Sequence, residues 1–69
     1  MFEKPVEIYI GKEYGVVLHK QSNASFEMWA THEFRTDAPN DYYWGNYTPS
    51  FEEAKEDFAN RVGDILQHH

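Results

Sequence analysis

The sequence predicts an α+β fold: a four-stranded antiparallel meander followed by one C-terminal helix that packs on one face of the sheet, in the order β-β-β-β-α. Apolar and polar side chains alternate with a period of two over most of residues 6–47, which is typical of strands. After Ser50 the apolar residues recur every three or four positions, which is typical of an amphipathic helix. The links between the alternating segments are too short for parallel crossovers, so we expect antiparallel neighbours.

The first two strands are predicted at residues 6–10 and 14–20. Gly11-Lys12-Glu13 separates them, and a short polar link that contains glycine suits a hairpin. The third strand is predicted at residues 26–34, because residues 21–25 have the Asn and Ser content of a turn.

The fourth strand is predicted at residues 42–47, where aromatic residues are concentrated. Residues 35–41 hold Asp, Pro and Asn close together, so we expect the longest loop of the domain there.

The helix begins after a capping box, in which Ser50 is the N-cap and Glu53 follows three residues later. Asp57 and Arg61 are spaced to pair across one helical turn. Gly63 lies inside the helix and costs about 1 kcal/mol of helix propensity relative to alanine. The apolar stripe comprises Phe51, Ala54, Phe58, Val62, Ile65 and Leu66.

One helix covers one face of the sheet, so the strand residues divide into a helix-facing set and an uncovered set. The set expected beneath the helix is Val6, Ile8, Ile10, Val16, Leu18, Phe26, Met28 and Phe34. The set expected on the uncovered face, with a partner-binding role, is Tyr9, Val17, Trp29, Tyr43 and Tyr47, with His19 beside them. A change of register in the fourth strand would expose Tyr42 and Trp44 there in place of Tyr43 and Tyr47.

Two interpretations of the uncovered rings remain open. Contiguous apolar area marks contact surfaces, and aromatic residues are enriched in the energetic centres of interfaces. Rings that stack across strands also stabilise a thin sheet, by roughly 0.2 to 1 kcal/mol for each pair.

Length and composition predict one small domain, assigned to residues 1–67, in which 17% of the residues are aromatic. His68 and His69 are interpreted as a tag remnant or a disordered tail. Cysteine is absent, and no leader-like or membrane-spanning segment is visible, so a cytoplasmic location is expected.

The charge balance disfavours direct binding of nucleic acid. Twelve acidic residues oppose six Lys and Arg, giving a net charge of -6, which repels phosphate backbones. An aromatic sheet face can stack bases, but the basic residues of this chain are scattered rather than clustered.

No motif predicts catalysis, a metal site or a cofactor. His19 and His32 fall on neighbouring strands, and Glu27 and Glu33 could approach them, but no dense ligand spacing such as H-E-x-x-H occurs. We therefore expect that the protein is not an enzyme and requires no cofactor.

A second function fits the acidic helix. Its carboxylates could stand in for phosphates and inhibit a DNA-binding enzyme. The residues concerned are Glu52, Glu53, Glu56, Asp57 and Asp64.

The segment Tyr43-Trp44-Gly45-Asn46-Tyr47, with the helix start at Ser50-Phe51-Glu52-Glu53-Ala54, resembles short uncharacterised accessory proteins of Firmicute mobile elements. The resemblance covers about residues 40–61 and implies an accessory role in a plasmid, phage or conjugative element. It transfers no catalytic residue. The leading hypothesis is a non-enzymatic, small acidic protein-interaction module that binds another protein or a second copy of itself through an open aromatic sheet face.

Overall fold

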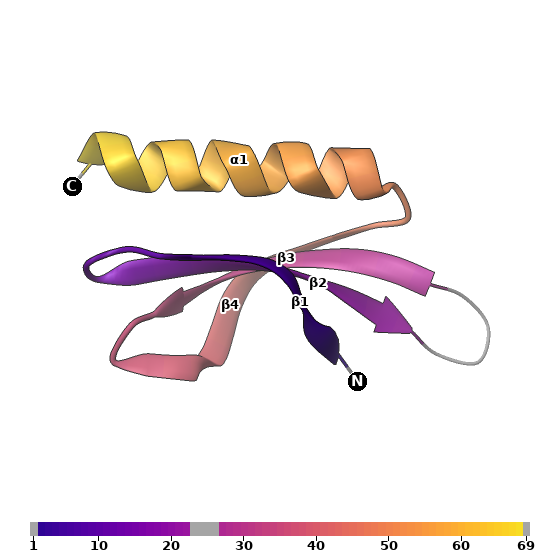
Figure 1. Ribbon diagram of the computed structural model, residues 1–69, viewed down its shortest axis with the longest axis horizontal. Helices are drawn as coiled ribbons and strands as arrows, with labels where there is room; N and C mark the ends of the chain where they lie inside the picture. Colours follow the sequence, from indigo (N-terminus) through magenta and orange to yellow (C-terminus); the bar gives the residue numbers. More distant parts are fainter. Residues whose placement is uncertain (1, 23–26, 69) are drawn as a thin grey trace.

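The computed structural model confirms the predicted architecture of four antiparallel strands and one C-terminal helix (Figure 1). It describes residues 2–22 and 27–68, so the turn expected at residues 23–25 and the side chain of Phe26 lie outside the described residues. The strand order in the sheet is β1-β2-β3-β4. The elements are β1 (Phe2–Ile10), β2 (Tyr14–Ser22), β3 (Glu27–Arg35), β4 (Ala38–Thr48) and α1 (Phe51–His68).

The link between β3 and β4 differs from the expected loop at residues 35–41. The chain turns at Thr36 and Asp37, and β4 begins at Ala38. The pairing then shifts from Arg35–Ala38 to Phe34–Tyr42, so the Pro-containing stretch is accommodated as an irregularity within the strand. The loop prediction was wrong because Pro and Asn are tolerated in an edge strand at a bulge.

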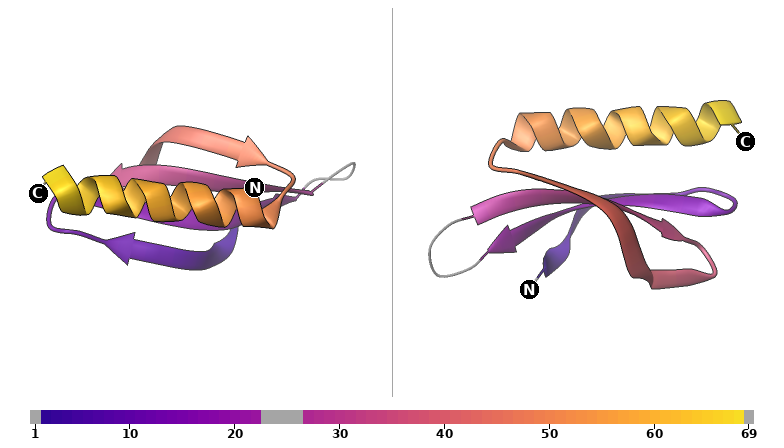
Figure 2. Two further views of the ribbon diagram at one scale, coloured as in Figure 1. Left: turned by 90° about the horizontal axis from the view of Figure 1, so that it is seen from above. Right: turned by 180° about the vertical axis from the view of Figure 1, so that it is seen from behind.

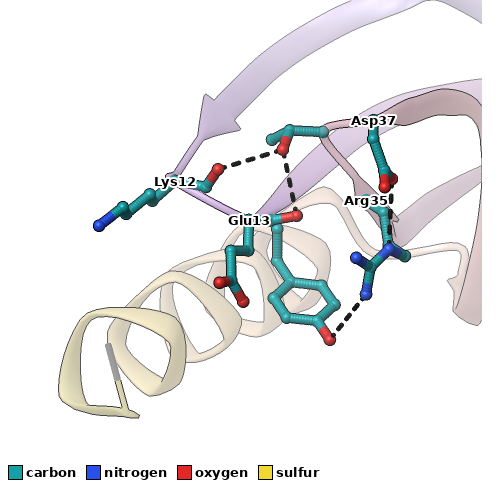
Figure 3. Close-up of polar contacts among 6 residues, drawn as sticks. Lys12, Glu13, Arg35 and Asp37 are labelled. Carbon is teal, nitrogen blue, oxygen red and sulfur yellow. Dashed lines mark hydrogen bonds and ion pairs between the residues drawn. The ribbon is translucent and has the colours of Figure 1, made fainter.

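The two hairpin turns are bonded to each other at one end of the sheet (Figure 3). Thr36 donates its backbone N–H to the Glu13 carbonyl at 3.0 Å, and its hydroxyl lies 3.2 Å from the Lys12 carbonyl. Arg35 donates to the Tyr14 hydroxyl at 3.3 Å and to the Asp37 carboxylate at 3.2 Å. These bonds hold β1–β2 and β3–β4 in one orientation.

The helix start uses three side chains. Ser50 accepts the Glu53 N–H at 3.2 Å, which confirms the predicted N-cap. Thr48 accepts the Ser50 N–H at 3.1 Å and donates its hydroxyl to the Glu53 carboxylate at 2.8 Å. In a capping box the Glu53 carboxylate would accept the Ser50 N–H directly. Here the Thr48 hydroxyl lies between these two groups.

The helix lies over the middle of the sheet and leaves β1 and β4 on either side of it (Figure 2). Phe51 packs its ring 4.6 Å from that of Trp29, and Ala54 accepts a hydrogen bond from the Thr31 hydroxyl at 3.5 Å. Further along the helix, Arg61 forms an ion pair with Glu33. Alternate residues of β3, from Trp29 to Glu33, therefore face α1.

The cross-strand pairs extend this assignment to the other strands and correct the predicted faces. The residues on the helix side are Glu7, Tyr9, Val16, Leu18, Trp29, Thr31, Glu33 and Tyr43. Of the set expected there, Val16 and Leu18 are confirmed, whereas Ile8, Ile10, Met28 and Phe34 lie on the opposite face. Val6 lies at the register shift between Pro5 and Glu7, so the pairing does not assign it to a face. The predicted positions of Tyr9, Trp29 and Tyr43 on the uncovered face were wrong.

Ambiguity in β2 and polar residues in β3 explain the error. Val16, Val17 and Leu18 are all fully buried, so the hydrophobicity of β2 does not distinguish its two faces. In β3 the less apolar alternate set faces the helix, because α1 supplies a carbonyl to Thr31 and a guanidinium to Glu33.

The face away from the helix has a buried core of its own. Val17, His19, Ala30, His32 and Phe34 are all buried there. The first half of β4 bends away from the helix in Figure 1, and Tyr42 of that segment contacts several of these side chains. The domain therefore buries side chains on both faces of one sheet.

Two glycines allow a test of this second core. An added Cβ on Gly15 would lie 2.2 Å from the Phe34 ring and 2.7 Å from the Tyr9 carbonyl oxygen, whereas one on Gly63 would meet nothing within 4 Å. We expect Gly15→Ala to lower the free energy of unfolding by roughly 2 kcal/mol through overpacking. The matched change Gly63→Ala should raise it by about 0.5 to 1 kcal/mol, because the helix loses a glycine. Urea denaturation measures both, and an unchanged stability for Gly15→Ala would contradict the described packing.

Candidate functional site

Two adjoining features occupy the side of the sheet away from the helix. The first is the histidine–tyrosine cluster, which we define as His19, His32, Tyr42 and Tyr47. The second is the β1 edge, which we define as the exposed side chains of Val6, Ile8 and Ile10 together with the outward backbone groups of Ile8 and Ile10.

Two buried histidines form the centre of the cluster. They lie diagonally across the β2–β3 ladder, because His19 pairs with Ala30 and His32 pairs with Val17. The His19 Nε2 atom lies 3.1 Å from the His32 Nδ1 atom, within hydrogen-bond distance. The other ring nitrogen of His32, Nε2, lies 3.1 Å from the Tyr47 hydroxyl oxygen. One hydrogen-bonded chain therefore runs from a buried imidazole to a phenol on the molecular surface.

The tyrosines of β4 cover the pair. Tyr42 stacks on His32 with ring centroids 5.3 Å apart and meets His19 edge-on at 5.4 Å. A side chain at Gly45 would prevent this approach, because its Cβ would lie 2.6 Å from the His32 ring. Gly45 follows Trp44, which has a φ of 54°, and the pairing of β4 is irregular at this point. The irregularity thus brings β4 close to the histidines.

Both imidazoles are neutral near neutral pH. Burial, followed by the neighbouring His32, lowers the pKa of His19 to about 4. Burial, followed by the positive charge of Arg61, also lowers the pKa of His32. A neutral imidazole has one donor and one acceptor, so the chain through His32 can be satisfied in either direction. A base with so low a pKa accepts protons poorly near pH 7.

The two carboxylates that could have approached the histidines lie elsewhere. Glu27 pairs with Lys20 at 3.0 Å, and Glu33 pairs with Arg61 on the helix side of the sheet. Within residues 2–22 and 27–68, no group of three or more His, Asp or Glu side chains could hold a metal ion. The cluster is therefore an array of neutral hydrogen-bonding rings.

The β1 edge exposes both side chains and backbone. Ile8 is 53% exposed and Ile10 is 67% exposed. Gly11 donates its N–H to the Tyr14 carbonyl, so this pair closes the hairpin as a hydrogen-bonded pair. Hydrogen-bonded and non-hydrogen-bonded pairs alternate along an antiparallel ladder, so Tyr9 bonds to β2, while Ile8 and Ile10 direct their N–H and C=O groups outward.

The opposite edge of the sheet is irregular over most of its length. The β3–β4 register shifts twice, and Pro39 removes one donor, whereas the two shifts and Pro5 of β1 lie before its regular segment from Glu7 to Ile10. Trp44 is 68% exposed at one of these irregularities. Such features hinder the addition of another strand at β4.

The acidic helix has fewer unengaged carboxylates than its sequence implies. Glu53 accepts a hydrogen bond from Thr48, and Asp57 accepts one from Arg61 at 3.1 Å, which confirms the predicted Asp57–Arg61 pair. Glu52, Glu56 and Asp64 are exposed. A shallow depression on the helix is lined by Glu53, Glu56, Asp57 and Asn60.

The structure brings together a different set of residues from the predicted partner-binding set. Tyr47 lies on the face away from the helix and is exposed, and Val17 lies there but is fully buried. Sequence reasoning placed Ile8 and Ile10 in the core beneath the helix, and it gave Tyr42 only as the alternative in a changed register of the fourth strand. The hairpin could have placed Ile8 and Ile10 on the correct face. If Gly11 pairs with Tyr14 at the turn, Ile8 lies on the same face as Val17 rather than Val16.

Comparison with protein-family models, with characterised proteins and with solved structures finds no significant match. Among the described residues, no helix has the length and apolarity needed to span a bilayer.

The histidine pair makes stability depend on pH. An unfolded chain binds protons at its imidazoles below about pH 6.5, whereas folded His19 resists protonation until about pH 4. Stability is therefore complete above about pH 6.5 and decreases as the pH falls towards 4. We expect a loss of about 2 kcal/mol between about pH 7 and pH 5, measured by urea denaturation.

The control for this experiment is the variant H68Q/H69Q, which removes the other two histidines and should keep the same pH dependence. An unfolding free energy that stays constant between about pH 7 and pH 5 would show that the pair is not held neutral.

Proposed function

We propose that the protein is a non-enzymatic protein-interaction module whose contact surface is the β1 edge with the adjoining Tyr42 and Tyr47. The observation that carries the proposal is that Ile8 and Ile10 expose aliphatic side chains and outward backbone groups together. An added strand would satisfy both at once, since its backbone bonds to the edge and its side chains cover the aliphatic ones.

The contrast between the two sheet edges supports this proposal. Natural sheets protect their edges with bulges, proline and charged residues, because a regular apolar edge is a template for pairing. Both edges carry two register shifts and a proline, Pro5 on β1 and Pro39 on β4, but β1 is regular from Glu7 to Ile10 and has isoleucines at alternate positions there. This regular apolar segment is the part of the sheet edge on which the proposal rests.

The chemistry of the histidine–tyrosine cluster is compatible with a binding role. Its imidazoles are neutral and buried, and the carboxylates that would tune them for acid–base catalysis are engaged elsewhere. Tyr47 is 43% exposed while its hydroxyl contacts His32, and a partly exposed aromatic side chain suits the rim of a protein interface. A role as an accessory protein of a mobile element, as the sequence resemblance implies, belongs to this proposal.

The test uses the double variant I8K/I10K, which introduces two charges at the β1 edge. We expect association with a protein partner or with itself to weaken by at least about tenfold, because the lysines remove apolar burial from the centre of the contact. The measurement is retention of partner, or of a second differently tagged copy, on the immobilised protein. Circular dichroism checks that the fold persists.

The matched control is Leu66→Lys, because Leu66 is 63% exposed on α1, away from the β1 edge. It should leave association unchanged. Equal losses in both variants would contradict the proposed surface. Binding that weakens steeply with salt, and with charge reversal at Glu52 and Glu56, would instead favour the nucleic-acid-mimicking helix.

A further inference from the structure

We propose that acid opens the middle of β4, residues 39–45, away from the sheet while β1, β2, β3 and α1 stay folded. The trigger is protonation of His19 and His32, whose rings this segment covers. Hydrogen bonds of Thr36 and Thr48 hold the chain beyond each end of the segment, so the opened segment forms a tethered loop. This opening does not depend on whether the β1 edge binds a partner.

The segment is weakly held to the sheet. A register shift in the β3–β4 pairing lies at each end of it, and within it only Tyr42 and Tyr43 pair with β3. Tyr43 is half-buried, and the other residues of the segment are exposed. Trp44 has a left-handed φ of 54°, which strains a residue that carries a side chain, and an open loop relieves this strain. Few ladder pairs and little burial are properties of segments that open locally.

The strands that carry the histidines are much more regular. β2 pairs with β3 without a register shift from Tyr14 to Ser22. His19 lies on β2 and His32 on β3, so moving these strands apart to hydrate the rings would break a continuous ladder. Lifting the β4 segment admits water to the same rings and breaks only two ladder pairs.

Protonation converts the histidine pair from an attractive contact into a repulsive one. In the neutral state one ring donates and the other accepts across the 3.1 Å between His19 Nε2 and His32 Nδ1. When both rings are protonated, both of these nitrogens carry hydrogen and two positive charges face each other. The rings then need water around them, and the covering Tyr42 ring excludes it.

The groups packed around the pair do not balance these charges. From β4 the rings meet Tyr42 and Tyr47, and on β1 the ladder partner of the β2 histidine is Pro5. Burial lowers the pKa of both imidazoles, and the positive charge of Arg61 on α1 lowers that of His32 further. Tyrosine and proline carry no charge near neutral pH, so these neighbours supply nothing that favours an imidazolium.

The direction of the pH effect follows from these shifts. In the closed form His19 resists protonation until about pH 4, whereas a hydrated imidazole binds a proton below about pH 6.5. Between these values the open form holds a proton that the closed form lacks, so the open fraction rises as the pH falls. For His19 alone the expected rise between pH 7 and pH 5 is about twentyfold.

Two neighbouring valines of β2 allow a matched test, because the chain contains no cysteine. Val17 is the ladder partner of His32 on the face away from the helix, whereas Val16 faces α1, and both are fully buried. The variants are Val17→Cys and Val16→Cys, and a pyridyl disulfide, which stays reactive in acid, measures how often each thiol is accessible. Leu66→Cys, at a residue that is 63% exposed, gives the rate of an open thiol at each pH.

Relative to Leu66→Cys, the reactivity of Val17→Cys should rise at least about tenfold between pH 7 and pH 5. At pH 5 it should exceed that of Val16→Cys at least about tenfold, with the helical circular dichroism unchanged. Adding His19→Gln, which keeps a hydrogen-bonding side chain that does not titrate, should reduce the rise. Adding H68Q/H69Q should leave the rise unchanged.

A steric change should open the segment without acid. A Cβ on Gly45 would lie 2.6 Å from the His32 ring, so Gly45→Ala disfavours the closed form. At pH 7 this change should raise the reactivity of Val17→Cys at least about tenfold and leave that of Val16→Cys unchanged. An unaltered Val17→Cys would show that the segment does not cover this core, which would overturn the proposal.

Three further outcomes would overturn it. Equal reactivity of Val16→Cys and Val17→Cys at pH 5 would show that acid unfolds the whole domain. A constant ratio of Val17→Cys to Leu66→Cys from pH 7 to pH 5 would show that the segment stays closed. Hydrogen exchange needs no substitution: at pH 5 the amides that bond residues 39–45 to β3 should be at least about tenfold less protected than those of β2, and uniform protection would contradict the local opening.

Discussion

The ion pair between Arg61 and Glu33 determines how the helix and the sheet fit together. Arg61 donates to Glu33 of β3 and to Asp57 of its own helix, each at 3.1 Å, and all three side chains are largely shielded from water. Removing one partner would leave a shielded charge uncompensated, which costs more than the pair itself contributes. Because strand residues alternate, a fixed Glu33 also fixes Thr31 and Trp29 beneath the helix and turns His32 to the other side.

This alternation of side chains along β3 accounts for the buried core on the face away from the helix. With His32 turned away from the helix, its nearest partners are His19, Val17 and the rings of β4. A cross-strand row then runs from Ile8 through Val17 to His32, which links the β1 edge to the centre of the histidine–tyrosine cluster. The Ile8 side chain therefore lies beside a fully buried valine, and the row continues to a neutral imidazole.

The sequence was sufficient for the type and order of the elements and for the helix start, because these depend on local signals, although it placed the start of β4 too late. Period-two alternation locates the strands, and Ser50 caps the helix as expected. Assigning each strand residue to one face of the sheet required knowledge of its tertiary contacts, which local sequence does not contain. Val16, Val17 and Leu18 form a continuous apolar run, and β3 gives its more polar alternate residues to the helix. Ile8 and Ile10 are apolar at alternate positions, so the pattern predicts that their side chains are buried beneath the helix. The β1–β2 pairing instead places them on the face away from the helix, where both are exposed.

The two outer strands of the sheet differ in how readily another strand could pair with them. On β1, Ile8 and Ile10 direct their N–H and C=O groups outward along a regular segment. The other outer strand is β4. There the register shifts twice, and Trp44 adopts a left-handed backbone conformation. The irregularity that brings β4 onto the histidines therefore also makes this edge a poor template for pairing, so the buried cluster and the protection of the β4 edge have one structural cause.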